Sequence, residues 1–549
     1  PPPPFSSVPG RSGRAVRLGG MMTATRWVSG IACWAPDEDR AFVEATVQEE
    51  SGSKCVIKVV GRDGVSESRT VDASELLPRS VEQRVFAEMD ELQELHQASV
   101  LNNLELLFGQ PQCDRPGEGP TVIYSSVGPT LIAMNPFVQL PIYGEEWIRA
   151  YREASGDPRR NKELGPHCYR TVEEAYGRLR SVKRQSVVIC GESGAGKTVT
   201  ARKMIEYLCT VARKPAKGKA KGGTHQEQIV QANIMLEAFG NAKTARNDNS
   251  SRFGKYTKLT FDPAGDYTIC GCHVDHYLLE RSRVVSHVKT ERSYHIFYQL
   301  LGSGEGAAFE LRGSAEDFVY TRQSATMSGP TDAEAFRSLV EEMTQAGFDE
   351  ETRTHIFRGV AAVLHLGNVD FTADADSCQV HPSTMPALER ACRMLGINAK
   401  ELGNAMTSRL LKGPGKEMIK TNVGADVARG QRDTVAKTMY ARLFDYIVST
   451  ISYRLKRTHP GPGAGGHGEA PEAVIGLLDI FGFEDLTVNG FEQMFINLTN
   501  ERIQQLFNSI MFDRELEAYK KEGITTAFNP DVENIECVRL FTSPANPPG

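Results

Sequence analysis

The stretch SVVICGESGAGKTVTARKMIEYL, residues 186–208, decides the fold of this chain. Its centre, GESGAGKT at 191–198, matches the phosphate-loop pattern G-x-x-x-x-G-K-[ST] at each fixed position. The apolar run at 186–190 is typical of a buried parallel strand, and residues 199–208 predict an amphipathic helix. Strand, glycine-rich turn and helix in this order direct backbone N–H groups and a helix N-terminus at one anion. The alternative, a chance glycine-rich turn, explains neither flank.

The residue types in this stretch suit a nucleoside triphosphate with Mg²⁺. Gly194 and Gly196 let the backbone approach phosphate oxygens because they carry no Cβ. Lys197 can reach the β- and γ-phosphates, and the Thr198 hydroxyl can ligate Mg²⁺. We therefore expect the phosphates to bind to Gly191, Glu192, Ser193, Gly194, Ala195, Gly196, Lys197 and Thr198.

Two further segments narrow the class of nucleotide-binding protein. DIFGFE (479–484) follows a second apolar run, and an acidic residue at the end of such a strand is the usual metal-side element. The glycine in this segment can offer its N–H to a γ-phosphate. NDNSSRFGK (247–255) is rich in hydroxyls and amides, which suits closure over a triphosphate. By itself, however, such a run is more often a polar surface turn.

Composition sets limits on the class of protein. The 549 residues are 40% hydrophobic and 24% charged, with a formal net charge of −6, which argues against a protein that coats nucleic acid. The 11 cysteines are dispersed without C-x₂-C pairs, so we expect reduced thiols in a cytoplasmic protein rather than a zinc site. No apolar run approaches the length that spans a bilayer, and the N-terminus has no secretory apolar segment.

The chain divides by its local patterns into several regions. Residues 1–25 lack periodicity and are expected to be disordered, whereas 26–79 hold short β-rich runs that predict a barrel of five or six strands. Residues 86–108 and 489–521 have helical patterns. The basic stretch 213–223 predicts a flexible surface loop.

A resemblance emerges from these segments taken together. GESGAGKT, NDNSSRFGK and DIFGFE, in this order, resemble the phosphate loop, switch I and switch II of the myosin motor head. LLERSRV (278–284), ERSYHIFYQL (291–300) and the long run at 497–524 also resemble family text. The resemblance implies an α/β phosphate-loop NTPase with a mixed central sheet flanked by helices, preceded by an SH3-like β-barrel at 26–79. It assigns 80–525 to the motor core and leaves 526–549 as a tail.

The resemblance also implies roles for particular residues. Thr198 and Ser251 would ligate Mg²⁺, and Asn247 and Ser250 would act from switch I. Arg252 would pair with Glu484, and the Gly482 N–H would sense the γ-phosphate. The purine side would be formed by Asn135, Pro136 and Tyr143, although Gln139 stands where the family often has a basic residue. Glu417 would supply a negative charge facing actin.

The implied function is hydrolysis of Mg·ATP by a cytoplasmic, cytoskeletal motor that acts on actin filaments. The alternative is a non-motile scaffold that binds nucleotide or actin without productive turnover. Beyond residue 525 the family pattern ends, so we expect a truncated head without the lever helix, and hence no light chains. We also expect the strand beside 186–190 to belong to the absent part, which would leave an open sheet edge. No nucleic acid or membrane span is expected.

Overall fold

The computed structural model describes residues 27–60, 65–80, 84–118, 121–213, 225–264, 266–327, 329–373, 377–412, 418–456, 473–485, 489–524 and 534–542. The predicted disordered segment 1–25, all but the first residue of the basic loop 213–223, and Glu417 lie outside the described residues. The chain forms two compact units, one of residues 1–171 with 498–549 and the other of residues 172–497.

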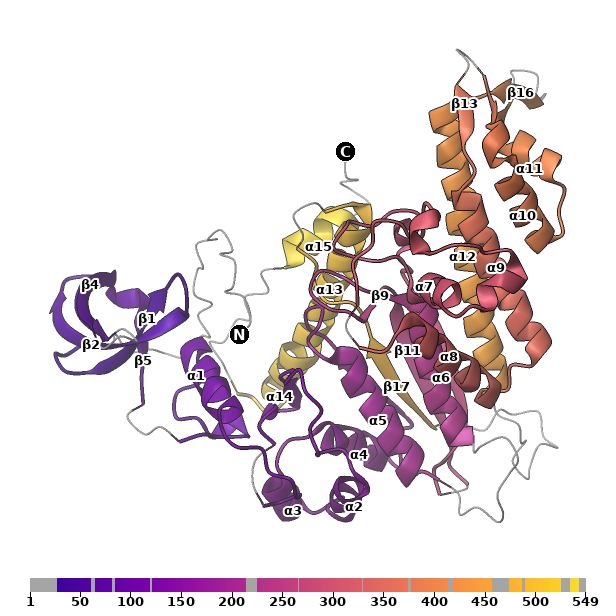
Figure 1. Ribbon diagram of the computed structural model, residues 1–549. Coiled ribbons are helices and arrows are strands. Elements are labelled where there is room, and N and C mark those ends of the chain that lie inside the picture. Colours follow the sequence, from indigo (N-terminus) through magenta and orange to yellow (C-terminus); the bar gives the residue numbers. More distant parts are fainter. Residues whose placement is uncertain are drawn as a thin grey trace. The chain divides into compact units, whose positions relative to one another are not determined.

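The first unit begins with a five-stranded antiparallel sheet in the order β4-β3-β2-β1-β5, which confirms the predicted small barrel (Figure 1). Its inward-facing residues, among them Cys33, Cys55 and Ile57, are fully buried and form one apolar core. The alternation of exposed and buried positions along β2 and β3 is what a closed sheet requires. The strands are β1 (Ala32–Asp37), β2 (Ala41–Ser51), β3 (Lys54–Val60), β4 (Ser66–Asp72) and β5 (Leu77–Pro78).

The helix predicted over 86–108 is wrong in its first half, because α1 covers only Gln97–Phe108. His96 ends the preceding segment by accepting a hydrogen bond from the Ser99 N–H, which caps the helix. Upstream, the Phe86 backbone bonds to the side chain of Asn103, so that segment does not extend the α-helix. The rest of this unit contains η2 (Met89–Glu91), β6 (Tyr124–Val127), β7 (Thr130–Ala133), α2 (Glu145–Glu153) and α3 (Pro158–Leu164), and α4 (Cys168–Arg178) begins in it.

The second unit is built on a mixed four-stranded sheet in the order β12-β11-β17-β8. Its strands are β8 (Arg184–Ile189), β11 (Gly254–Asp262), β12 (Thr268–Tyr277) and β17 (Ala473–Asp479). β8 runs parallel to β17, and the other pairings are antiparallel. The prediction that β8 is parallel is confirmed, but the prediction that it is buried is wrong. Among the described residues it pairs with β17 alone, and Val188 is 42% exposed.

Helices flank this sheet, as Figure 1 shows, and the phosphate-loop helix α5 packs on β17 while α12 packs on β12. Two small hairpins and two short helices gather near one end of α9 and α12, away from the sheet (Figure 1). The helices named here or flanking the sheet are α5 (Lys197–Val211), α6 (His225–Gly240), α7 (His295–Gly302), α8 (Asp332–Gln345), α9 (Glu350–Gly367) and α12 (Ala425–Arg454). The hairpins are β13 (Phe371–Ala373) with β14 (Cys378–Val380) and β15 (Ser408–Lys412) with β16 (Met418–Asn422), and the short helices are α10 (Met385–Leu395) and α11 (Ala399–Met406).

The helical run predicted over 489–521 is present as three consecutive pieces. α13 (Phe491–Asn508) passes into a π-helical turn at Ser509–Asp513 and then into α14 (Arg514–Lys521). The short helix α15 (Ile535–Thr542) follows. All 11 cysteines are free, as expected for reduced thiols. None of the described helices combines the length and the apolar character needed to cross a membrane.

Candidate functional site

The glycine-rich loop lies between β8 and α5, and its backbone has the geometry that its glycines allow. Gly191, Gly194 and Gly196 have φ of 145°, 83° and 91°, a region that residues with a Cβ rarely enter. α5 begins at Lys197 directly after the last of these glycines. The unpaired N–H groups of its first turn therefore lie beside the loop, and this arrangement favours binding of an anion.

Lys197 is folded back over this loop. Its ammonium donates to the Gly191 carbonyl oxygen at 2.8 Å and to the Glu192 carbonyl oxygen at 2.7 Å. Burial lowers the pKa of Lys197, while Asp479 and Glu484 act in the opposite direction. The cation is thus held over the loop by backbone oxygens.

Two pairs of hydroxyl groups connect the loop to a second segment. Thr198 Oγ1 lies 3.2 Å from Ser251 Oγ, and Ser193 Oγ lies 3.1 Å from Ser250 Oγ. Both serines form β10 (Ser250–Ser251), which pairs with β9 (Asn241–Ala242). We call residues 243–252 the switch I loop. The structure therefore brings together the two hydroxyls, on Thr198 and Ser251, that the sequence nominated as Mg²⁺ ligands.

Asp479, at the end of β17, is a buried carboxylate beside this hydroxyl pair. Burial raises its pKa, whereas Lys255, a hydrogen bond from Thr198 and Lys197 lower it. Lys255 is itself buried and donates to the side chain of Asn233 at 2.9 Å. The sequence offered Asp479 as a general metal-side element without a specific contact. Its contact with Thr198 depends on the pairing of β17 with β8.

Gly482 lies directly against the phosphate loop. A Cβ placed there would come within 1.9 Å of the Gly191 carbonyl oxygen and 2.7 Å of the Glu192 Cα. Those are backbone atoms, so no side chain can move aside to make room. Glycine at 482 is therefore required by this close approach of two backbone segments.

Asn247 lies at the turn of the switch I loop, beside the phosphate loop. Its carbonyl oxygen accepts from the Thr244 N–H at 2.8 Å, and its side-chain oxygen accepts from the Asn249 N–H at 3.0 Å. A Cβ on Gly194 would lie 3.7 Å from the Asn247 Cβ. The turn is therefore closed by its own polar groups and stands next to the glycine-rich loop.

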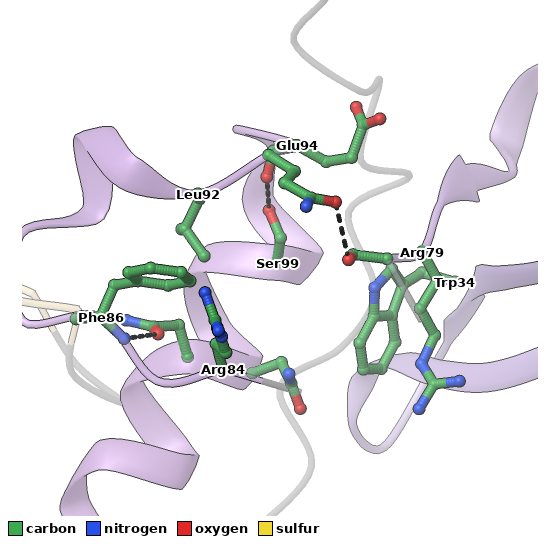
Figure 2. A pocket seen from close by; sticks show the side chains of 11 residues that line it. Trp34, Arg79, Arg84, Phe86, Leu92, Glu94 and Ser99 are labelled. Atoms are coloured by element: carbon green, nitrogen blue, oxygen red, sulfur yellow. Dashed lines mark hydrogen bonds between the residues drawn. The ribbon is translucent and has the colours of Figure 1, made fainter. Parts of the chain in front are cut away.

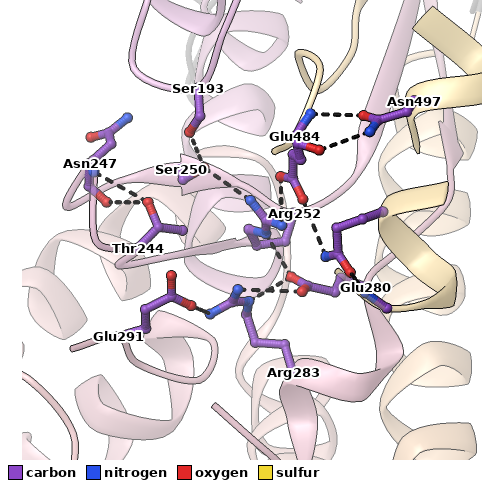
Figure 3. Close-up of polar contacts among 12 residues, drawn as sticks. Ser193, Thr244, Asn247, Ser250, Arg252, Glu280, Arg283, Glu291, Glu484 and Asn497 are labelled. Carbon is purple, nitrogen blue, oxygen red and sulfur yellow. Dashed lines mark hydrogen bonds and ion pairs between the residues drawn. The ribbon is translucent and has the colours of Figure 1, made fainter. Parts of the chain in front are cut away.

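Arg252 is buried and lies between two carboxylates (Figure 3). Its Nη2 is 2.9 Å from Glu484 Oε1, and its Nε donates to Glu280 Oε2 at 2.6 Å. Burial disfavours the charged guanidinium, but the two carboxylates outweigh that cost and raise the pKa of Arg252. The pairing of Arg252 with Glu484 is thus present in the structure. The second partner, Glu280, was not anticipated.

The buried charges continue past Glu280, as Figure 3 shows. Glu280 accepts from Arg283 Nε at 2.6 Å, and Arg283 Nη1 donates to Glu291 Oε2 at 2.8 Å. Burial opposes ionisation of Glu280, yet the two guanidinium groups hold its pKa below the ordinary value. We call this alternating series the charge ladder, which runs through Glu484, Arg252, Glu280, Arg283 and Glu291.

Sequence reasoning missed Glu280 as a second partner of Arg252, and it missed Arg283 and Glu291, which continue the series. A signal was available, because LLERSRV and ERSYHIFYQL place several charged residues beside apolar ones. Only the folded chain shows which of those charges turn inward. The backbone of Glu484 is also fixed, because its N–H and its carbonyl oxygen each form a hydrogen bond of 2.8 Å with the Asn497 side chain.

The residues predicted for the purine side lie in the first unit. Asn135 Oδ1 accepts from the Phe137 N–H at 2.9 Å, and the Tyr143 hydroxyl lies 2.9 Å from that of Tyr124. Pro136 stands between Asn135 and Phe137, and Phe137 has φ of 54° and is 83% exposed. Tyr143 is thus fixed within a packed cluster, whereas the Asn-Pro turn carries an exposed aromatic side chain.

That cluster surrounds His167, which is fully buried. Its Nδ1 accepts from the Tyr169 N–H at 3.0 Å, so the neutral ring carries its hydrogen on Nε2. Burial lowers the pKa of His167 from 6.5 to about 3, although a backbone hydrogen bond with Ile142 acts in the opposite direction. The rings around it, at centroid distances of 4.6 to 5.7 Å, are those of Tyr124, Tyr143, Trp147, Tyr151 and Tyr169. We call these six residues the aromatic box.

A small pocket lies between the barrel and α1 (Figure 2). The Arg79 guanidinium stands 5.4 Å from the ring centre of Trp34 and pairs with Glu44 at 2.7 Å. The cavity has a volume of about 50 Å³, enough for one or two water molecules and far too small for a nucleotide. Its lining includes Trp34, Arg79, Arg84, Phe86, Leu92, Glu94 and Ser99.

A mixed sheet, a glycine-rich loop feeding α5, and two further segments against that loop define a phosphate-loop NTPase fold. The chain belongs to the myosin head family. The family model for the myosin head motor domain matches residues 86–549, and the model for the myosin N-terminal SH3-like domain matches residues 20–79. The implied family, the phosphate-loop fold with its mixed sheet and the SH3-like barrel are therefore confirmed.

Similar proteins include long unconventional myosins. Unconventional myosin-Va of Homo sapiens is 39% identical over 457 residues, which is 82% of this chain and 23% of that protein. Unconventional myosin-Vc of Homo sapiens is 36% identical over 502 residues, 89% of this chain and 27% of that protein. Myosin-14 of Homo sapiens is 34% identical over 546 residues, 96% of this chain and 25% of that protein. The chain thus spans about a quarter of the length of these relatives.

Proposed function

We propose that this chain binds Mg·ATP, hydrolyses its γ-phosphate bond and acts on actin filaments as a motor ATPase of the myosin type. The observation that carries the proposal is the meeting of three segments at one loop. Thr198 contacts Ser251, Gly482 touches the backbone at Gly191, and Arg252 pairs with Glu484. Membership of the myosin head family supports the same chemistry.

The residues present fit Mg·ATP. Three glycines with positive φ, an N-terminal helical turn and the Lys197 ammonium suit a chain of phosphates. Mg²⁺ prefers oxygen ligands, and the hydroxyls of Thr198 and Ser251 are close enough to share one ion. The phosphates would contact the loop from Gly191 to Thr198, with Asn247 and Ser250 reaching them from the switch I loop. Bound Mg²⁺ would neutralise part of the phosphate charge.

The chain's own groups would accelerate the reaction mainly by position and charge. Lys197 would exchange its carbonyl partners for phosphate oxygens, which stabilises charge that develops in the transition state. Gly482 lies against the backbone of the phosphate loop, and its N–H would donate to the terminal phosphate. The closed pair of Arg252 and Glu484 would hold the attacking water in line.

The purine side of the site is proposed for Asn135, Pro136 and Tyr143. Support comes from the rigid surroundings of Tyr143, whose hydroxyl bonds to Tyr124 and whose carbonyl oxygen accepts from the Tyr169 hydroxyl at 3.0 Å. A fixed aromatic ring loses little entropy when it packs against a ligand. We therefore propose that Tyr143 contributes to selection of the base.

The actin-facing part of the proposal concerns the hairpin of β15 and β16, which brackets Glu417. Leu410, Leu411 and Ile419 on these strands are 63%, 43% and 51% exposed, and such an apolar surface suits a protein partner. The same proposal implies a location with actin filaments in the cytoplasm.

The test is steady-state hydrolysis of ATP by the 549-residue chain in Mg²⁺, with and without actin filaments. We expect hydrolysis that actin stimulates, together with nucleotide-sensitive sedimentation with actin. Tight binding of ATP or actin without turnover would instead support the non-motile scaffold. Absence of both nucleotide binding and actin binding would contradict both.

A further inference from the structure

The charge ladder does not end on a charged partner. At its far end, each of the two carboxylate oxygens of Glu291 accepts a hydrogen bond. One oxygen, Oε2, pairs with Arg283 Nη1 at 2.8 Å, and the other, Oε1, accepts from the Ala245 N–H at 3.2 Å. Ala245 belongs to the leading leg of the switch I loop, two residues before Asn247. The ladder therefore ends on the loop that carries the candidate site.

The residues after Glu291 follow this leading leg. The Arg292 N–H donates to the Lys243 carbonyl oxygen at 3.0 Å, and Tyr294 forms an isolated β-bridge with Ala242. The base of the leg is thus held by backbone contacts. Beyond that base, the side chain of Glu291 carries the attachment of Ala245.

The trailing leg of the loop meets the same ladder. Arg252, its last residue, pairs with Glu280 and Glu484, and the Glu280 N–H donates to the Arg252 carbonyl oxygen at 3.0 Å. Both legs of one loop are consequently tied to a single series of buried and partly buried ion pairs. The other end of that series is Glu484, in the segment that lies on the phosphate loop.

We propose that Glu291 is a positioning residue of this site, which fixes the leading leg of the switch I loop to the charge ladder. Asn247, Ser250 and Ser251 lie between the two tied legs, so their placement over the phosphate loop depends on both attachments. Glu291 touches neither the phosphate loop nor the hydroxyl pair. It acts through the backbone of Ala245.

The hydrogen bond from Ala245 to Glu291 is of a strong type. A carboxylate accepting from a backbone N–H forms a stronger bond than a neutral acceptor does, and Arg283 holds this carboxylate in one orientation. Ala245 is itself exposed, so without Glu291 its N–H would bond to water. The leg would then lose the hydrogen bond between the Ala245 N–H and the Glu291 side chain, which lies outside the loop.

The first experiment measures amide hydrogen exchange across residues 243–252 in the nucleotide-free chain. Glu291→Ala should exchange this segment about tenfold faster than the wild type, with exchange in β11 and β12 unchanged. Glu291→Gln keeps an oxygen that can accept from Ala245 and should restore most of the protection. Glu316→Ala is the matched control, because Glu316 is an exposed glutamate that accepts from the Gln323 N–H at 3.0 Å.

The second experiment rests on the proposed function and measures the Mg²⁺ concentration that gives half-maximal ATP hydrolysis. Glu291→Ala should raise it several-fold and lower kcat about tenfold, because Ser251 is no longer held in place. A purely structural role would lower the melting temperature without moving the Mg²⁺ requirement. Unchanged exchange at 243–252 in a folded Glu291→Ala protein would overturn the inference. Loss of hydrolysis in the wild type would overturn the proposed function alone.

Discussion

The charge ladder and the aromatic box bury polar groups by opposite means. In the ladder, Glu280 and Arg252 stay ionised because each contacts two groups of opposite charge. In the box, His167 is surrounded by rings and accepts from a backbone N–H, and no carboxylate among the described residues offsets the cost of its burial, so it stays neutral. Removing charge from water is costly in both regions, and the local partners decide whether that cost is met by pairing or by loss of the proton.

This difference indicates which region can couple a structural change to the binding of a ligand. The neutral, close-packed aromatic box has one arrangement of its side chains and contains no ion pair that could exchange partners. An alternating ladder can exchange partners, since Arg252 keeps Glu280 if Glu484 moves away. The ladder therefore suits a site that opens and closes, and the box suits a fixed wall.

The largest effect is expected at Lys197, a cation held by carbonyl oxygens and thus ready to accept a charged ligand. Lys197→Ala should lower ATP hydrolysis by about a thousandfold or more and severely weaken nucleotide binding. Lys203→Ala is the control, because Lys203 lies on the same helix and pairs with Glu206 at 2.8 Å. A Lys197→Ala protein with wild-type turnover would contradict the proposed site.

The ladder itself is tested by Glu280→Gln and Glu484→Gln, alone and together. Glu280→Gln leaves two buried guanidinium groups short of a partner and should lower the free energy of unfolding by about 3–5 kcal/mol. Glu484→Gln should cost less stability, because Arg252 retains Glu280, yet it should slow hydrolysis while nucleotide still binds. Denaturant unfolding and single-turnover hydrolysis measure the two effects, and additive losses in the double mutant would refute a shared network.

A further test of the ladder is the double mutant Arg252→Glu with Glu484→Arg. Exchanging the charges of Arg252 and Glu484 would restore one pair in isolation. However, Glu at 252 would face Glu280, which lies 2.6 Å from the present guanidinium. We therefore expect little recovery of hydrolysis from the swap unless Glu280 is also neutralised, and full recovery by the swap alone would show that Glu280 does not matter.

The aromatic box is tested by pH. Above pH 6.5 His167 is neutral in both the folded and the unfolded chain, so protonation contributes nothing there. Below that pH the unfolded chain binds a proton that the folded state refuses until about pH 3, and the free energy of unfolding falls through this window. By pH 4.5 the loss should be about 2–3 kcal/mol.

His167→Phe should remove this pH dependence while retaining the ring. The measurement is urea unfolding at pH 7 and pH 4.5 for wild type and variant. Other buried histidines, such as His295, contribute equally to both proteins and cancel in the difference. An identical pH slope in the variant would show that His167 takes up its proton over the same pH range in the folded and unfolded chain, and the contrast with the ladder would fail.

The smallest effect is expected at Arg79, where water reaches an ion pair of the same type. Glu44 is 49% exposed, so the pair and the contact with Trp34 should together contribute about 1 kcal/mol. Arg79→Met in the wild-type chain, followed by thermal unfolding with and without added salt, measures it. A loss as large as that of Glu280→Gln would mean that burial does not separate the two kinds of pair.

Much of the site could be predicted because its chemistry is written in contiguous residues. The phosphate loop needs glycines at fixed positions and a lysine beside them, so GESGAGKT alone indicates a phosphate-binding turn. The pairing of Arg252 with Glu484 rested on a resemblance and is geometrically present. The helix over 86–96 was mispredicted because the Asn103 side chain, on α1, bonds to the Phe86 backbone and the His96 side chain caps the start of α1.

The phosphate loop, the small barrel and the family could be predicted from the sequence, because these depend on local backbone freedom and on short periodic patterns. The members of the charge ladder, the need for glycine at 482 and the loss of the proton from His167 follow from the folded structure. These properties arise from contacts between residues far apart in the chain, such as Glu484 with Arg252 and Gly482 with Gly191. The energy of a buried charge depends on its neighbours in space, and the order of residues along the chain does not contain that distance.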